Sequence, residues 1–198
     1  MLRRLLSAIT GNTAPSTPSR EVHDVRGFRV VVENGRADIS TAAVLARLDE
    51  AIALAERYQP WRVNHLRRDL REFWVVRFPC RGAYFPEARA CVTELTFLAR
   101  TDISAAPVAA SILHEGMHAR VDRMGVDAAS RDRAREERIC RRAELDFGLA
   151  LPNPLGAPVV ERALASLALD DEGVAPNVDW AEALRRQDAV DGKRAIDR

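Results

Sequence analysis

The chain has 198 residues, of which 47% are hydrophobic and 30% are charged, and its formal net charge at neutral pH is +1. A chain of this length and composition can bury one core, so we expect one folded domain. The near-zero net charge gives no general attraction to nucleic acid or to an anionic membrane, so no nucleic-acid partner is expected.

The N-terminal segment differs in composition from the rest of the chain. Residues 1–9 are too short and too interrupted by arginine to span a membrane, and residues 11–19 are rich in Ser, Thr and Pro. We expect residues 1–20 to be a flexible segment, with a frayed terminus favoured over docking on a membrane surface or a partner. A single domain is expected over 21–190, followed by a loose tail over 191–198.

Hydrophobic periodicity and turn residues predict the elements of the first half of the chain. They are a strand or hairpin beginning at Val22 with a strand over 27–33 that Asn34-Gly35 closes, a helix over 40–58 that Ser40 opens, a segment over 62–72 that fits helix or loop equally, and strands over 73–78 and 91–98. A small sheet is therefore expected before the middle of the chain.

Helices are expected to dominate the second half. A mostly buried helix over 104–124 is rich in small and apolar residues, and a charged helix follows over 129–149. After a Pro-rich break come a short amphipathic helix over 159–169 and a last helix that starts at Trp180. The absence of any internal repeat or Gly-rich phosphate loop leaves the first of these helices as the main source of functional information.

That helix carries the sequence His114-Glu115-Gly116-Met117-His118. Histidines four residues apart lie about 40° apart around a helix, so both imidazoles can reach one metal ion. Glu115 projects beside such a metal, where it can accept a proton from a water molecule and return it to a leaving amine. The spacing thus supplies two zinc ligands and a general base, and Gly116 indicates close backbone packing or substrate approach.

A catalytic zinc takes three protein ligands and keeps one position for water. No histidine follows His118, so another residue type must be the third ligand. Glu137 and Glu144 are two helical turns apart on nearly one face, so one could bind the metal while the other orients a histidine or pairs with Arg141. Glu136 is expected to point elsewhere and to be solvated. Asp122 is a candidate to support a ligand, although a plain helix-face charge is equally compatible with its position.

With Glu137 placed eighteen intervening residues after His118, the chain resembles the gluzincins, metallopeptidases with the pattern H-E-x-x-H-x18-E. The resemblance covers residues 104–149 and implies that His114, His118 and Glu137 bind zinc while Glu115 is the base. Two positions depart from the family pattern: Glu136 stands where the family often has asparagine, and Arg141 stands where it has a supporting acidic residue.

The three cysteines, Cys80, Cys91 and Cys140, form no C-x-x-C pair and are odd in number. A disulfide framework is therefore not expected, and a reducing, cytoplasmic location is favoured. Cys91 is an alternative metal ligand placed ahead of the helix, but a small buried residue in a strand is the favoured interpretation.

Substrate contacts are less strongly indicated. If the strand over 91–98 is an edge strand, Thr93 and Thr96 line the cleft and the backbone holds an extended peptide; an interior strand without substrate contact fits the sequence equally well. His65 and Tyr84 are candidate donors to a developing oxyanion, although a structural role is more common for a lone His or Tyr.

Together these features predict an α+β, zincin-like domain in which a small sheet packs on the active-site helix and a glutamate-bearing helix follows. The expected function is hydrolysis of a peptide bond with one Zn²⁺ and with Glu115 as general base. The main alternative is a non-catalytic or degenerate zincin module that binds a protein partner in regulation. A weaker alternative is a hydrolase that acts on a non-peptide substrate.

Overall fold

The computed structural model describes residues 20–125 and 132–196, so the flexibility expected for residues 1–19 lies outside the described part of the chain. In this part of the chain a mixed five-stranded sheet is combined with helices, which makes the fold α+β. None of the described helices is both long and apolar enough to cross a membrane.

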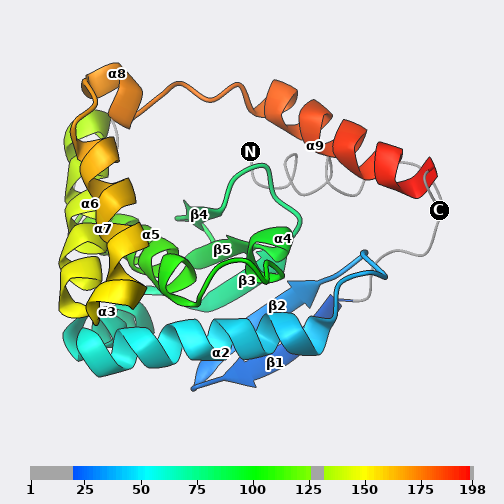
Figure 1. The fold of residues 1–198 in the computed structure, drawn as a ribbon, viewed down its shortest axis with the longest axis horizontal. Coiled ribbons are helices and arrows are strands. Elements are labelled where there is room, and N and C mark those ends of the chain that lie inside the picture. The colour runs from blue at the N-terminus through cyan, green and yellow to red at the C-terminus, as the bar shows by residue number, and fades with distance from the viewer. Residues whose placement is uncertain (1–19, 126–131, 197–198) are drawn as a thin grey trace.

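Figure 1 shows the arrangement of the elements. In chain order they are β1 (Arg20–Val25), β2 (Phe28–Glu33), α2 (Thr41–Tyr58), α3 (Pro60–Asp69), β3 (Glu72–Val76), β4 (Gly82–Phe85), β5 (Ala90–Glu94), α4 (Leu95–Leu98), α5 (Ala106–Arg123), α6 (Arg133–Ala150), α7 (Asn153–Leu167), α8 (Asp171–Val174) and α9 (Trp180–Ile196).

The strand order in the sheet is β1-β2-β3-β5-β4, with β2, β3 and β5 parallel and both edge strands antiparallel to their neighbours. The first hairpin turns at Arg26 and Gly27, whose φ angles of 52° and 76° lie in the left-handed region that favours glycine. The turn of this hairpin thus lies before β2. Asn34-Gly35, which we expected to close the strand over 27–33, follows the end of β2 at Glu33. The ambiguous segment over 62–72 is largely helical, since α3 extends to Asp69.

One face of the sheet carries the main core. Val30, Phe73 and Cys91 come from three neighbouring strands, are fully buried, and pack in one cluster with apolar residues of α2 and α5. Phe73 meets Phe28 edge to face at a centroid distance of 5.2 Å. This packing places α5 against the sheet (Figure 1).

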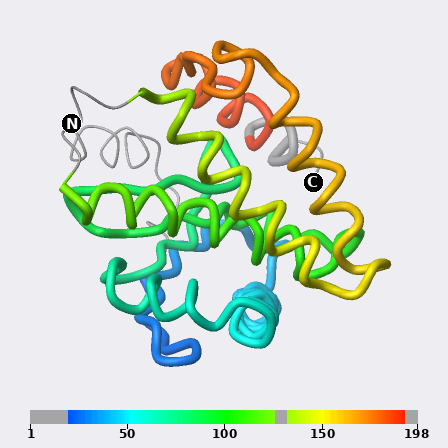
Figure 2. The backbone as a smooth tube through the Cα atoms, turned by 90° about the vertical axis from the view of Figure 1, so that its left-hand side faces the viewer, coloured from blue at the N-terminus to red at the C-terminus, as the bar shows by residue number. Residues whose placement is uncertain are grey.

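The C-terminal half places two more helices beside α5. Figure 2 shows α6 and α7 running antiparallel along one another. Their close approach needs glycine, because a Cβ added at Gly156 would overlap with the carbonyl oxygen of Gly148. α6 also packs on α5, so the three helices lie together.

The strand predicted over 91–98 is shorter than expected. β5 ends at Glu94, whose side chain accepts a hydrogen bond from the backbone N–H of Phe97 and caps the short helix α4. β5 is also an interior strand, because β4 pairs with its other side. β4, which the sequence did not indicate, is the edge strand next to α5.

Candidate metal centre

The segment His114–His118 lies in the middle of α5. His114 and Glu115 are both buried, with 6% and 8% of their surface exposed. Gly116 faces α3, and a Cβ at this position would overlap with the side chain of Leu66. The close packing that the sequence indicated at this glycine is thus confirmed, and it fixes α5 at the level of both histidines.

Three side chains converge on one point between α5 and α6. The Nε2 atoms of His114 and His118 are 3.2 Å apart. Glu137 extends from α6 towards both rings, with one carboxylate oxygen 3.3 Å from Nε2 of His114 and the other 3.4 Å from Nε2 of His118. In a tetrahedral zinc site with ordinary Zn–N and Zn–O bonds, neighbouring ligand atoms lie about 3.3–3.5 Å apart. These three side chains could therefore hold one metal ion with little movement.

The outer nitrogen of each imidazole is held by a second carboxylate of α6. Nδ1 of His114 is 2.7 Å from Glu144 Oε1, and Nδ1 of His118 is 2.7 Å from Glu136 Oε1. A carboxylate at Nδ1 keeps the proton on that nitrogen, so that the Nε2 lone pair faces a metal. The expectation that Glu136 is solvated was wrong, because its side chain reaches back across the interface between the helices to His118.

Glu144 is the most completely buried carboxylate of this cluster, with no exposed surface. Arg141 donates a hydrogen bond of 2.6 Å to one of its oxygens, and Arg162 of α7 donates one to the other. Burial alone raises the pKa of a carboxyl group, but the contacts with His114 and the two arginines outweigh burial and lower the pKa of Glu144 to about 2. Glu144 is therefore a fixed negative charge that orients His114.

The imidazoles and Glu137 stabilise one another's charged forms. Burial lowers the pKa of His114, but hydrogen bonds to Glu137 and Glu144 outweigh it and raise that pKa. Burial also lowers the pKa of His118, but the contacts of His118 with Cys140 and with two carboxylates outweigh burial and raise that pKa. The two imidazoles in turn lower the pKa of Glu137 against the effect of burial. The cluster thus attracts positive charge to the point between the rings.

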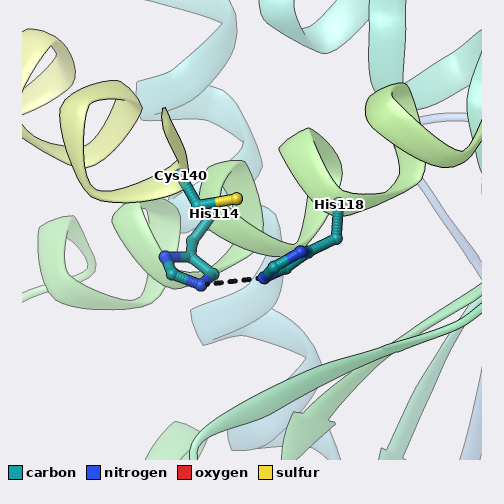
Figure 3. A group of neighbouring side chains, drawn as sticks. All are labelled: His114, His118 and Cys140. Atoms are coloured by element: carbon teal, nitrogen blue, oxygen red, sulfur yellow. Dashed lines mark hydrogen bonds between the residues drawn. The ribbon is translucent and has the colours of Figure 1, made fainter. Parts of the chain in front are cut away.

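Cys140 is a further ligand candidate, and the sequence analysis did not single it out. It lies on α6 one turn after Glu137, is fully buried, and its sulfur lies within 4.8 Å of nitrogens of both histidines (Figure 3). Burial raises the pKa of the Cys140 thiol, while contact with His118 lowers it in part. The available signal was its spacing of three residues from Glu137, which places both on one face of a helix.

Glu115 lies beside this point without ligating contacts of its own. Burial raises the pKa of Glu115, and the two nearby histidines oppose this effect. Gly82 of β4 lies directly against it, since a Cβ there would come within 3.1 Å of Glu115 Oε1. A carboxylate with a raised pKa is more basic, which suits it to accept a proton and later to return it.

A cavity of about 450 Å³ opens in front of the cluster. His114, Glu115, His118, Glu136 and Glu137 form its floor. One wall is the edge strand β4 with the loop before it, and the opposite wall is the segment from the end of α8 to the first turn of α9. The floor is charged, whereas both walls are largely apolar.

The remaining predicted residues lie around this cavity or away from it. Tyr84 lines it, and its hydroxyl donates a hydrogen bond of 3.0 Å to Asp122, so these two predicted residues pair with one another. Burial and Asp122 raise the pKa of Tyr84. Neither His65 nor Cys91 is among the described residues that line the cavity. His65 lies on α3, where burial and Arg120 lower its pKa. Cys91 is buried in β5.

The two threonines of the predicted edge strand also lie outside this cavity. Thr93 is buried in β5, and Thr96 lies in α4 beside a different cavity.

Comparison with family models, with curated proteins and with solved structures finds no match for the chain. The function is therefore inferred from the side chains around His114 and His118.

Proposed function

We propose that this protein is a zinc-dependent peptidase with a zincin-like arrangement of its site. His114, His118 and Glu137 would bind the zinc ion, as in the gluzincins. The observation that carries the proposal is the convergence of both Nε2 atoms and both Glu137 oxygens at the spacing of a tetrahedral zinc site. A zinc ion bound there supplies Lewis acidity, which activates water and polarises a carbonyl group.

The protein side chains would perform the proton transfers and the positioning. Glu115 is buried and faces the cavity, so its carboxylate would take a proton from the attacking water and return it to the leaving amine. Glu136 and Glu144 would keep both imidazoles in the orientation that presents Nε2. The raised pKa of Glu115 increases its basicity, which favours the first of these transfers.

The position of β4 favours an extended peptide as the substrate. Among the described strands β4 pairs only with β5, so its other edge has no strand partner and could form backbone hydrogen bonds with a peptide. Gly82 at the start of this strand lies against Glu115, which would bring the scissile bond close to the base. We propose a cytoplasmic location, because all three cysteines are free thiols.

Metal content tests the first part of the proposal. Purified protein should contain about one zinc ion per chain, and His114→Ala should lose it because two of the three ligands bind far more weakly. His23→Ala is the matched control, since His23 lies on the opposite edge strand β1. Elemental analysis of the three proteins is the measurement. Full zinc retention in His114→Ala would refute the proposed site.

Peptide cleavage tests the second part. Glu115→Gln should keep its zinc and its fold but lose on the order of 10²–10⁴-fold in cleavage rate, because an amide cannot accept the proton. Glu161→Gln, which changes an exposed carboxylate on α7, should cleave as the wild type does. A broad peptide library analysed by mass spectrometry provides the readout. Cleavage by Glu115→Gln at the wild-type rate would exclude Glu115 as the base.

The position of Cys140 favours a second candidate function. If His114, His118, Glu137 and Cys140 all bind the metal, no position remains for water, and the site is structural. The protein would then be a non-catalytic module that binds a protein partner in regulation. Cobalt substitution separates the candidates, because a thiolate ligand gives an intense near-ultraviolet charge-transfer band. That band in the wild type and its loss in Cys140→Ala would favour the structural site, whereas cleavage without the band favours the peptidase.

A further inference from the structure

The cavity over the candidate metal centre is partly covered by a C-terminal segment that no catalytic step requires. We call residues 175–183 the strap. Ala175, Pro176, Val178, Trp180 and Ala183 of the strap line the same cavity as the two histidines and Glu137. Between α8 and α9 the strap is extended, and Figure 1 shows it crossing the side of the molecule on which β4 lies.

Only a few contacts of the described residues hold the strap in this position. Arg133, one helical turn before Glu137 on α6, donates to the carbonyl oxygen of Pro176 and to the side chain of Asn177, at 3.2 Å each. The ring of Trp180 packs against that of Phe78, just ahead of β4, at a centroid distance of 5.8 Å. The strap is thus held at one end by α6 and at the other by the loop before β4.

A third contact holds α9 beyond the strap. Asp191 accepts hydrogen bonds from Arg36 and from Arg77 at about 3.1 Å. Arg77 also binds the buried carboxylate of Glu94, so this contact is connected to the end of β5. The side chain of Asp191 is 29% exposed, so solvent can reach this contact.

The large apolar side chains of the strap are incompletely buried where they lie. Val178 is 45% exposed and Trp180 is 40% exposed, although both contribute to the cavity wall. A segment held by one aromatic pair and a few exposed polar contacts is stabilised far less than the core beneath it. The cavity that remains below it, about 450 Å³, is small for an extended peptide of several residues.

We propose that the strap is an autoinhibitory cover, which must lift from the Phe78 side for a peptide to reach β4 and the candidate metal centre. The inhibitory role rests on the proposed peptidase function, whereas the lifting of the strap does not. An extended peptide would take the place of Trp180 between α6 and the loop before β4. Closure would thereby limit cleavage to peptides that bind well enough to displace the strap.

Cys80 reports on the strap independently of any enzyme activity. Its thiol lines the cavity below the strap, two residues from Phe78, whereas Cys91 and Cys140 are fully buried. Burial and Glu115 raise the pKa of the Cys80 thiol to about 12, so its reaction with N-ethylmaleimide at pH 8 is slow in the closed state. Lifting of the strap exposes the thiol to solvent and speeds the reaction.

The experiment compares the rate of Cys80 labelling by N-ethylmaleimide, read by peptide mass spectrometry, in the full-length metal-free wild type and in three variants. Trp180→Ala should label about 2- to 10-fold faster, the range expected for loss of an aromatic pair. Asp191→Asn should label faster by a smaller factor. Asp188→Asn, the same substitution at an exposed position of α9, should label at the wild-type rate.

Cleavage of a susceptible peptide by the zinc-loaded proteins is the second readout. Trp180→Ala should show a lower KM than wild type with an unchanged kcat, because only access improves. Equal labelling of Cys80 in wild type and Trp180→Ala overturns the proposal, as does faster labelling of Cys91 and Cys140 to the same extent, which signals general unfolding. Faster labelling of Cys80 alone, without cleavage by any variant, supports the moving strap while the peptidase function fails.

Discussion

Replacement of Glu144 by glutamine tests how much the buried carboxylate beneath His114 stabilises the protein. Glu144 has no exposed surface, and its contacts with His114, Arg141 and Arg162 lower its pKa from 4.5 to about 2. A shift of this size corresponds to about 3 kcal/mol of differential stabilisation of the ionised form. We expect Glu144→Gln to lower the free energy of unfolding at pH 7 by about this amount.

The pH dependence provides a sharper test than the absolute loss. Because the folded-state pKa of Glu144 lies below its unfolded value, its contribution is fully present above about pH 4.5. It is lost progressively as the pH falls from about 4.5 to about 2, because the unfolded state binds the proton first. Wild-type protein should therefore lose stability over this range, and Glu144→Gln should lose about 3 kcal/mol less than wild type.

Urea unfolding, followed by far-ultraviolet circular dichroism at a series of pH values, measures both effects. Chelator is present throughout, so that bound metal does not contribute to the free energy of unfolding. Glu161→Gln is the control, because it removes an exposed carboxylate from α7. If wild type and Glu144→Gln lose stability in parallel between pH 4.5 and 2, the carboxylate is not the stabilising group inferred here.

Three further expectations concern packing, ligation and protons. Gly116→Ala should lower the free energy of unfolding by about 1 kcal/mol, because overpacking against Leu66 exceeds the gain in helix propensity; a double-mutant cycle with Leu66→Ala should show non-additivity. Glu137→Ala should abolish zinc binding, whereas Glu136→Gln should weaken it about 10- to 100-fold in chelator competition. Since both imidazoles have raised pKa values without metal, zinc should release protons on binding, measurable by calorimetry in buffers of different ionisation enthalpy, and its affinity should fall as pH falls.

Local sequence signals predicted those helices whose causes are local, whereas α7 begins at Asn153, inside the segment that was expected to be a break. Ser40 caps α2 by accepting a hydrogen bond from the backbone N–H of Ala43, as a serine before an apolar periodic segment indicates. The helix that carries His114 begins within two residues of its expected start. Its close packing at Gly116 was also foreseeable, because an interior glycine in a helix needs a steric reason.

The edge strand β4 was not predicted, because it forms through pairing with a strand from another part of the chain. Residues 82–85 are few and show no clear alternation, and they become a strand through pairing with β5. The expected strand over 91–98 was cut short at Glu94, which caps α4 with its side chain and binds Arg77. Pairing partners and capping contacts of this kind depend on tertiary structure, which a single sequence does not specify.

The role of Glu136 was missed for a related reason. Consecutive residues of a helix point about 100° apart, so a glutamate next to a ligand is expected to face away from the metal. Here α6 packs against α5 so that two consecutive glutamates reach the same ring, with Glu137 at Nε2 and Glu136 at Nδ1 of His118. Whether a glutamate of α6 contacts His118 thus depends less on the direction in which its side chain leaves the helix than on how far that side chain extends across the interface.

The metal donors and the substrate contacts therefore come from different parts of the fold. The converging donors of His114, His118, Glu137 and Cys140 and both carboxylates that orient the histidines belong to α5 and α6, so the docking of these two helices brings them together. The walls of the cavity come from β4, the loop before it and the strap that covers it. Substitutions in these walls should consequently change which peptides bind while zinc affinity stays constant, whereas substitutions between α5 and α6 should change both. Such independence of metal binding from substrate preference is the expected behaviour of a helical metal centre placed beside, and not within, a sheet.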